Sequence, residues 1–481
     1  MKREARRILL PILEITEIAS PSDKNAIKVP LSKGGTYFEY YVRKKHDEVE
    51  GNRTDHKPSW MRSEFNLYPI VLDKNGVPWA EANIYLLSRI ESSISPTMST
   101  YASIADSLAA FRRFLDETEI DWTDFPSHKL KRPTYRYHSY LKLEIASGRL
   151  KASTAKRRMS AVISFYSWLK QEGTLTPTNL PWKESDRYIQ LVDLHGFKFS
   201  KHITSTDVSI KTTQSQDPYD KRIDDGGKLK PLTTQEQEWL IDSLISLGNT
   251  EMLLIHLLGL VTGARIQTIL TMRIKHVSAE FNSGTADEVR LPAGPGTDID
   301  TKNDKKIIIH IPIWLYKKLN IYAKSERAKK RRARSDVGEN ESQYLFLSVR
   351  GSPLYKSKSD SLMFNQSYSI RHAKAGQGVR QFITDRVIPL IRTKNNAPDF
   401  HYQFHDTRAS YGMNLTDRQL ERVSIGEITL HQAREFVKAR MSHESSATTD
   451  RYLQYRSNLE IVSNINARYD EHLKNLVDIC L

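Results

Sequence analysis

Apolar residues recur with helical spacing through residues 98–173. Positions four, three and four residues apart fall on one face of an α-helix, and the residues with this spacing are Ile104, Leu108, Phe111 and Leu115. The first part of the region is therefore predicted to be a helix that turns this face toward a core.

Two further helices are predicted in the same region. One covers about residues 134–146 and ends before Gly148. The next begins at Ser153-Thr154, residue types that favour a helix N-cap, and closes at Gly173. The apolar stripe of this last helix consists of Ala155, Met159, Val162, Tyr166 and Leu169. Together the three segments predict a compact helical domain.

Short runs of β-branched and aromatic residues predict strands near the N-terminus. Residues 37–42 have strand composition. The pair Asn75-Gly76 lies between the apolar runs 70–72 and 77–79, and such a pair between apolar runs predicts a β-hairpin.

A second helical region follows a polar connection, residues 174–231, which we interpret as interdomain. The pattern of residues 233–236 is a capping box that predicts a helix start. Residues 252–261 are apolar on nearly all sides, which predicts a buried helix. Two strands of a small sheet are expected at 289–291 and 307–311, and helices dominate again after them.

The expected fold class is therefore mainly α with a small β-sheet, arranged as two domains. The apolar positions beyond residue 457 keep a helical spacing, so a C-terminal helix is expected there. The predicted boundaries are an N-terminal extension of unreadable role at 1–82, a helical domain at 83–175, a linker at 176–230, a mixed α/β domain at 231–456 and the C-terminal helix at 457–481.

The charge of the chain points to a polyanionic partner. Its 481 residues include 72 Lys and Arg against 57 Asp and Glu, a net charge of +15. Nucleic acid or an anionic membrane surface would fit this charge. The single cysteine, Cys480, excludes an internal disulfide framework and a cysteine-based zinc cluster and fits a reducing compartment. Neither a membrane span nor a signal peptide is expected.

Two basic clusters allow two interpretations each. Lys156, Arg157 and Arg158 lie off the apolar stripe of their helix, so they form a solvated face or hold phosphates as DNA-binding residues. The densest run, residues 327–334, is either a solvated helix end or a contact to a phosphate backbone.

Chemistry is concentrated in the last 220 or so residues, in four features that are each weak alone. Gly263 allows a sharp turn after the buried helix and leaves an arginine at a fixed position. Residues three apart on a helix share a face, so a His and an Arg can reach one target. The four features are Arg265 after that turn, Lys302 before the strand at 307–311, His405 with Arg408, and Tyr452 nine residues after His443.

Together these residue types can cut a phosphodiester without a metal. Two arginines hold non-bridging phosphate oxygens with paired hydrogen bonds and neutralise the charge of the transition state. A tyrosine hydroxyl, with a reference pKa of about 10, becomes a nucleophile when a nearby histidine accepts its proton. A lysine can protonate the departing 5′ oxygen. No carboxylate cluster for Mg²⁺ is apparent, so no metal and no cofactor are expected.

The order and spacing of these residues resemble the tyrosine recombinases, the phage integrase family of site-specific DNA recombinases. The resemblance covers residues 230–456 and extends more loosely to 80–173. It implies a two-domain DNA clamp, with a helical core-binding domain and a mixed α/β catalytic domain. It also implies a 3′-phosphotyrosyl intermediate and a free 5′-hydroxyl that later attacks a partner strand.

The resemblance assigns a role to each matched position. Tyr452 would be the nucleophile, Arg265 and Arg408 the phosphate clamp, Lys302 the general acid, His405 the proton acceptor, and His443 a hydrogen-bond donor to the phosphate.

The sequence departs from the family pattern at several positions. Thr268 stands where the family usually has an acidic residue, three positions after the first arginine, and Ser442 stands where glycine is frequent. The segment before Lys302 is longer than a tight hairpin, which leaves Lys305 and Lys306 as alternatives for the general acid. Tyr455 is a nearby competitor of Tyr452.

The expected function is that of a site-specific DNA recombinase or integrase. The alternatives are a type IB topoisomerase-like enzyme that relaxes DNA, or a non-catalytic DNA-binding protein that keeps the fold. The expected partners are double-stranded DNA at specific sites, further copies of the chain in a homotetramer on DNA, and accessory DNA-bending or directionality proteins. The C-terminal helix would pack on its own domain or dock on a neighbouring protomer. The expected location is cytoplasmic, on a bacterial nucleoid, with no membrane partner.

Overall fold

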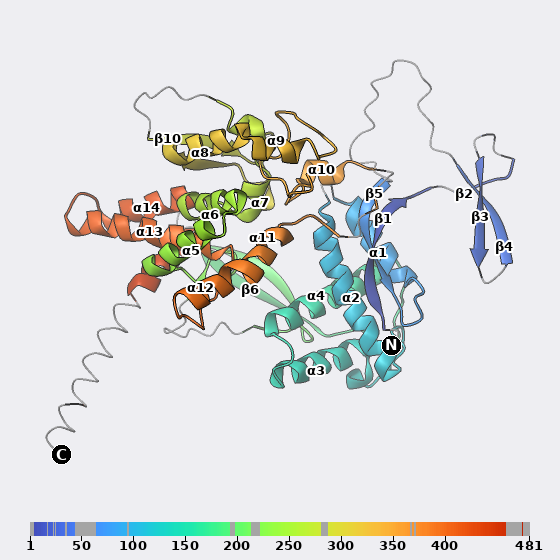
Figure 1. Ribbon diagram of the computed structural model, residues 1–481. Helices are drawn as coiled ribbons and strands as arrows, with labels where there is room; N and C mark the ends of the chain where they lie inside the picture. The colour runs from blue at the N-terminus through green and yellow to red at the C-terminus, as the bar shows by residue number, and fades with distance from the viewer. Residues whose placement is uncertain are drawn as a thin grey trace. The chain divides into compact units, whose positions relative to one another are not determined.

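In a computed structural model the chain divides into two compact units (Figure 1). The first contains residues 1–214 and 361–373, and the second contains residues 215–360 and 374–481. The structure describes residues 4–16, 18–22, 24, 26–33, 36–43, 64–93, 96–192, 198–212, 222–279, 287–365, 368–369, 372–457 and 474. The predicted C-terminal helix lies outside these residues, apart from 457 and 474.

The first unit is built on a helical core that confirms the three predicted helices. Aromatic rings fill this core, with Trp79 and Phe165 in an edge-on contact at 5.2 Å between ring centroids. The last helix begins with Lys151 as its N-cap and without a side-chain cap; the predicted cap at Ser153-Thr154 was wrong, because both residues lie inside the helix. The helices are α1 (Ala80–Glu91), α2 (Met98–Thr118), η1 (Lys129–Lys131), α3 (Pro133–Ala146) and α4 (Ala152–Gln171).

Two small antiparallel sheets precede the helices. One pairs β1 (Arg6–Glu14) with β5 (Glu64–Leu72), and the other orders β2 (Ile18–Ala19), β4 (Thr36–Arg43) and β3 (Ala26–Lys33). The strand predicted at residues 37–42 is thereby confirmed.

The hairpin predicted around Asn75-Gly76 was wrong in its second strand. The turn exists, and the Asp73 side chain accepts hydrogen bonds from the backbone N–H groups of Asn75 and Val77. After an isolated bridge from Leu72 to Pro78, the chain enters α1. The Trp79 N–H still donates to the Val71 carbonyl at 2.9 Å, and the pairing stops because α1 begins at Ala80.

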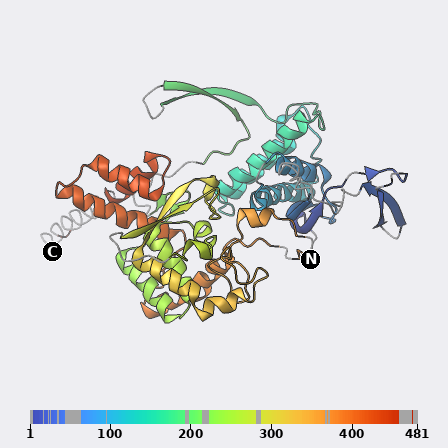
Figure 2. The ribbon, with the colours of Figure 1, turned by 90° about the horizontal axis from the view of Figure 1, so that it is seen from above.

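The predicted linker contains regular structure. Strands β6 (Glu184–Val192) and β7 (Lys198–Thr206) form a two-stranded antiparallel ribbon in the first unit, drawn in green in Figure 2. Nearer the second helical region, β8 (Ile223–Asp224) and β9 (Lys228–Leu229) form a short hairpin in the second unit.

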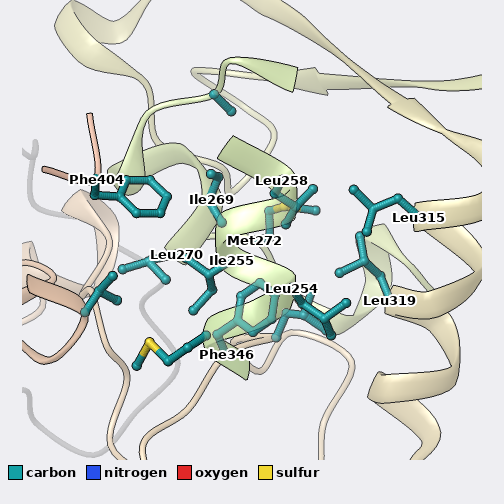
Figure 3. Close-up of a cluster of buried hydrophobic side chains, with 14 of the residues drawn as sticks. Leu254, Ile255, Leu258, Ile269, Leu270, Met272, Leu315, Leu319, Phe346 and Phe404 are labelled. Carbon is teal, nitrogen blue, oxygen red and sulfur yellow. The ribbon is translucent and has the colours of Figure 1, made fainter. Parts of the chain in front are cut away.

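The second unit is organised around the apolar helix α6 (Figure 3). The predicted capping box at Thr233 is present, with the Thr233 hydroxyl bound to the backbone of Glu236. The predicted buried helix is α6, and the two predicted strands pair antiparallel with Leu291 opposite Ile309. The first elements are α5 (Thr234–Ser246), α6 (Thr250–Thr262), α7 (Ile266–Leu270), η2 (Ile274–His276), β10 (Glu288–Ala293), η3 (Lys302–Asp304) and β11 (Ile307–Pro312).

Helices complete the second unit, so the prediction of a mainly helical fold with small sheets is confirmed. They are α8 (Ile313–Lys324), α9 (Glu326–Arg332), α10 (Lys358–Leu362), α11 (Gln377–Phe382), the π-helical turn η4 (Ile383–Val387), α12 (Ile388–Lys394), α13 (Asp406–Ser424) and α14 (Leu430–Met441). Residues 446–457 are also helical.

Three arginines of the basic run at 327–334 form salt bridges within their own unit. Arg327 and Arg331 lie 2.7 and 2.9 Å from the buried carboxylate of Glu251 on α6. Arg332 makes a salt bridge to Glu339 at 2.7 Å. A carboxylate that is 1% exposed needs paired cations, so these three arginines join α9 to its own unit.

Within the described ranges no helix has both the length and the apolar character needed to cross a membrane.

Candidate active site

Arg265 is held by a sharp turn at the end of α6. Gly263 caps this helix with φ +65°, in the left-handed region. A Cβ at Gly263 would lie 3.2 Å from Cε1 of Tyr411, so both the conformation and the space require glycine. Arg265 then forms the N-cap of α7. Its Nε is buried without a hydrogen-bond partner, so this guanidinium keeps a donor for a ligand.

Arg408 is buried in the first turn of α13 and uses all three guanidinium nitrogens. Nε donates to the carboxylate of Asp225, Nη1 to the carbonyl of Gly263 and Nη2 to the carbonyl of Met441, each at 2.8 Å. The side chain therefore connects the end of α6, the end of α14 and the β8–β9 hairpin.

His405 is the N-cap residue of α13 and faces the same region as Arg408. Burial, together with the charges of Arg265 and Arg408, lowers its pKa to about 4. The backbone of Asp225 acts in the opposite direction on this pKa, but more weakly. At neutral pH this histidine is uncharged and can accept a proton.

His443 follows α14, and Tyr452 lies in the helical segment that comes next. The ring centroids of His443 and Tyr452 are 5.7 Å apart with the planes 26° from parallel. Nδ1 of His443 lies 3.0 Å from the Thr449 hydroxyl, and Nε2 lies 3.3 Å from Oδ2 of Asp225. The carboxylate accepts, so Nε2 carries the proton.

Tyr452 is fully buried and donates its hydroxyl proton to Oδ2 of Asp225 at 3.1 Å. Burial and the negative charge of Asp225 raise its pKa well above the ordinary value. The phenol is therefore protonated in this arrangement. Tyr455 packs against the apolar cluster that contains Tyr452.

Lys302 lies in the 3₁₀ turn η3 between β10 and β11. It lines a small cavity of about 30 Å³ together with Arg265 and Arg408. Of the two alternative lysines, Lys305 makes a 2.6 Å salt bridge with Glu444. Lys306 lines a separate, wider hollow beside α14. Lys302 is thus the lysine beside the arginines that has no carboxylate partner within the described residues.

Sequence reasoning missed Asp225, which lies at the centre of the site. The composition of Asp224-Asp225-Gly226-Gly227 was a clear turn signal, but it was interpreted as part of a linker. Burial alone would raise the pKa of Asp225, but the hydrogen bond from His443 and the charge of Arg408 outweigh it and hold the pKa well below its ordinary value. Asp225 is therefore an anion surrounded by hydrogen-bond donors.

Gly412 was missed as well. It lies on α13, and its missing side chain leaves room for the ring of Tyr452. A glycine inside a helix carries no chemical pattern that sequence reasoning could have used.

The basic cluster of α4 belongs to the other unit of the chain. Lys156 and Arg157 are exposed, and Arg157 donates a hydrogen bond to the Ser103 hydroxyl at 3.2 Å. Both, like Arg158, belong to the first unit, whereas all six predicted catalytic side chains belong to the second.

No group of three or more His, Cys, Asp or Glu side chains that could hold a metal occurs among the residues that the structure describes.

Comparison with known proteins identifies the helical part of the first unit. Residues 86–173 match the family model of the phage integrase N-terminal SAM-like domain. A search of curated proteins found no match.

Similar solved structures include lambda integrase (residues 75–356), as a dimer bound to a COC′ core site. It is 15% identical, with 78% of this chain and 94% of that chain covered and a TM-score of 0.41. The Tn1549 transposon integrase with circular intermediate DNA is 13% identical, with coverage of 77% and 94% and a TM-score of 0.38. The XerA recombinase is 15% identical, with coverage of 78% and 91% and a TM-score of 0.27.

Proposed function

We propose that the chain is a tyrosine-type site-specific DNA recombinase or integrase, since residues 86–173 match the family model of the phage integrase N-terminal SAM-like domain. The observation that carries the proposal is the convergence of Tyr452, Arg408 and His443 on one carboxylate oxygen. Donors that converge on one anion in a buried site are suited to a phosphate oxygen.

The reaction follows from the chemistry of these side chains. The phenol oxygen of Tyr452 attacks the phosphorus of a backbone phosphodiester, and the bond from phosphorus to the 5′ oxygen breaks. The products are a 3′-phosphotyrosyl link and a free 5′-hydroxyl. The arginines stabilise the charge on the phosphoryl oxygens during the transfer.

Two protons move in this step. His405 is uncharged in this structure and is proposed to accept the proton that Tyr452 loses, directly or through a water, once a bound phosphate neutralises the Arg265 and Arg408 charges that lower the His405 pKa. Lys302 gives a proton to the departing 5′ oxygen. Rejoining is the reverse reaction, with the 5′-hydroxyl of a partner strand as the attacking group.

Double-stranded DNA at specific sites is the proposed substrate. Strand exchange between two duplexes involves four cleavages, so we propose a homotetramer on DNA, with accessory DNA-bending or directionality proteins. The cationic residues of α4 are proposed to contact phosphates, and binding should weaken steeply with salt. A soluble, cytoplasmic location on a bacterial nucleoid is part of the proposal.

The experiment uses labelled, nicked duplexes taken from the DNA that flanks the gene. We expect a protein–DNA adduct that survives denaturing electrophoresis with the unmodified protein and is absent with Tyr452→Phe. The matched control is Tyr455→Phe, which changes a neighbouring phenol and should keep the adduct. An adduct formed by Tyr452→Phe would contradict the proposal, and equal cleavage of duplexes of unrelated sequence would favour the topoisomerase-like alternative.

A further inference from the structure

The Asp225 carboxylate occupies the position that the proposed reaction needs for a phosphate. Its oxygen Oδ2 accepts hydrogen bonds from Nε of Arg408 at 2.8 Å, from the Tyr452 hydroxyl at 3.1 Å and from Nε2 of His443 at 3.3 Å. The other oxygen lies 3.8 Å from Nη2 of Arg265. Each of these four partners is a residue proposed to contact the scissile phosphate or to attack it.

We propose, on the basis of the proposed function, that residues 224–227 form an autoinhibitory plug in which the Asp225 carboxylate takes the place of the DNA phosphate. A carboxylate and a phosphodiester both present anionic oxygens to guanidinium and imidazole donors. The two cannot occupy the same set of donors together, so the plug must leave before the reaction starts.

The backbone of the plug covers the remaining cation. Gly226 has φ +73°, and a Cβ at this position would lie 3.1 Å from Nζ of Lys302 and 3.8 Å from Nη2 of Arg265. A larger residue would have to displace the lysine, so glycine lets the turn lie flat on the site. The cavity left beside these side chains is about 30 Å³.

Asp225 is poorly suited to serve as the base that activates Tyr452. The hydrogen bond from His443 and the charge of Arg408 lower the pKa of the carboxyl despite its burial, whereas burial and the Asp225 charge raise the pKa of the phenol. Proton transfer from Tyr452 to Asp225 is therefore unfavourable, because the donor has a raised pKa and the acceptor a lowered one. The contact holds the nucleophile in its protonated and unreactive form.

The flanking Ile223 and Leu229 are buried, at 2% and 4% exposure, so the plug would leave the site by rearrangement of the turn between them. Strands β8 and β9 have two residues each. An attachment outside the site is the hydrogen bond from Nη1 of Arg451 to the Asp224 carbonyl at 2.6 Å.

The test compares Asp225→Asn and Asp225→Ala with the unmodified protein and with the control Asp224→Asn, whose carboxylate lies 3.9 Å from Nη1 of Arg451. Adduct formation is measured on the nicked duplex. We expect it to be about tenfold faster in both Asp225 variants, the gain when the competent fraction rises from about a tenth to nearly all. Arg451→Ala, which loosens the plug with Asp225 intact, should give a smaller increase. Unchanged or slower adduct formation in the Asp225 variants would overturn the plug.

A second measurement is independent of DNA cleavage. Asp225→Asn leaves the guanidinium groups without their anion, so its melting temperature should rise when inorganic phosphate is added. The unmodified protein and Asp224→Asn should show no such rise. If no variant forms an adduct but Asp225→Asn responds to phosphate, the proposed function fails and the carboxylate still occupies an anion site. Equal responses in Asp225→Asn and the unmodified protein would overturn the plug even if the adduct forms.

Discussion

Gly412 faces the ring of Tyr452 so closely that α13 has no room for a side chain at this position. A Cβ at Gly412 would lie 2.9 Å from Cζ of Tyr452, the carbon that carries the hydroxyl, and 3.0 Å from Cε of Met441. The ring is fully buried, and close-packed protein interiors resist the displacement of a ring. The absent side chain of Gly412 therefore helps to fix the position of the proposed nucleophile.

The first prediction is that Gly412→Ala displaces Tyr452 and abolishes or severely slows adduct formation. Alanine is the better helix former by roughly 0.5–1 kcal/mol, yet overpacking costs about 1–3 kcal/mol, so the free energy of unfolding should fall. Adduct yield and urea denaturation measure the two effects. The control is Gly378→Ala on α11, where a Cβ would make an ordinary contact of 3.5 Å to Leu354. A fully active Gly412→Ala would show that the ring is not held there.

The second prediction separates the two arginines by what they contact. Arg408 donates to two backbone carbonyls besides Asp225, so Arg408→Lys should leave buried acceptors unpaired and lower the free energy of unfolding by about 2–4 kcal/mol. Arg265 has a buried Nε without a partner, so Arg265→Lys should change stability by less than about 1 kcal/mol but abolish adduct formation. Denaturation curves and adduct assays on both variants decide this, and equal stabilities would contradict it.

The third prediction concerns Lys302 and the leaving group. Lys302→Ala should form the adduct very slowly on ordinary DNA, because the 5′ oxygen leaves without a proton. On DNA in which a sulfur replaces that bridging oxygen, the departing thiolate needs no proton, so the variant should approach the rate of the unmodified protein. Lys306→Ala is the matched control and should behave as unmodified on both substrates. If sulfur rescued Lys305→Ala or Lys306→Ala instead of Lys302→Ala, the general acid would be that other lysine.

The fourth prediction is a loss of stability on mild acidification. Burial lowers the pKa of His256 and of His405 from 6.5 to about 4. Between pH 6.5 and pH 4 these histidines bind protons in the unfolded chain but not in the folded chain. The free energy of unfolding is therefore highest above pH 6.5 and falls as the pH drops toward 4. Each histidine accounts for up to about 3 kcal/mol of the free energy of unfolding that is lost. Urea midpoints across this range should show the loss, with a shallower slope in His256→Gln, and a flat profile would contradict it.

The fifth prediction concerns Ser442, which caps α14 with φ +53° in the left-handed region. This conformation is unfavourable for a residue with a Cβ, so Ser442→Gly should raise the free energy of unfolding by about 0.5–1 kcal/mol after the added chain entropy is counted. Urea denaturation measures the change. Ser446→Gly, in the helical segment that follows, should lower it instead. Destabilisation by Ser442→Gly would show that the serine side chain supports the turn.

The helices of both units could be predicted because their apolar positions repeat every three to four residues. Leu108 and Phe111 of α2, and Ile255 and Leu258 of α6, are all buried as their spacing required. The strand after Asn75-Gly76 was mispredicted because a turn signal does not reveal that the next segment continues as a helix. The β6–β7 ribbon was missed because polar and apolar residues are mixed irregularly along both strands, without the regular alternation that predicts a half-buried strand.

The site shows a similar limit. Arg265, His405, Arg408, His443 and Tyr452 were selected by residue type and order, and the fold places their side chains around Asp225. Asp225 itself lies 183 residues before Arg408, which donates a hydrogen bond to it. A contact at such separation leaves no local pattern. Gly412 could not be predicted for another reason. Its role is to leave space for the ring of Tyr452, and this space is known only once the ring has been placed.

The most direct test of the central claim is to identify the amino acid that becomes joined to DNA. After the adduct is digested with nuclease and trypsin, cleavage at Arg451 and Arg456 yields a short peptide that contains both Tyr452 and Tyr455. Fragmentation in a mass spectrometer then locates the phosphorylated phenol. The account predicts a 3′-linked nucleotide on Tyr452 alone. A nucleotide on Tyr455, on a serine or on any residue outside this peptide would contradict it.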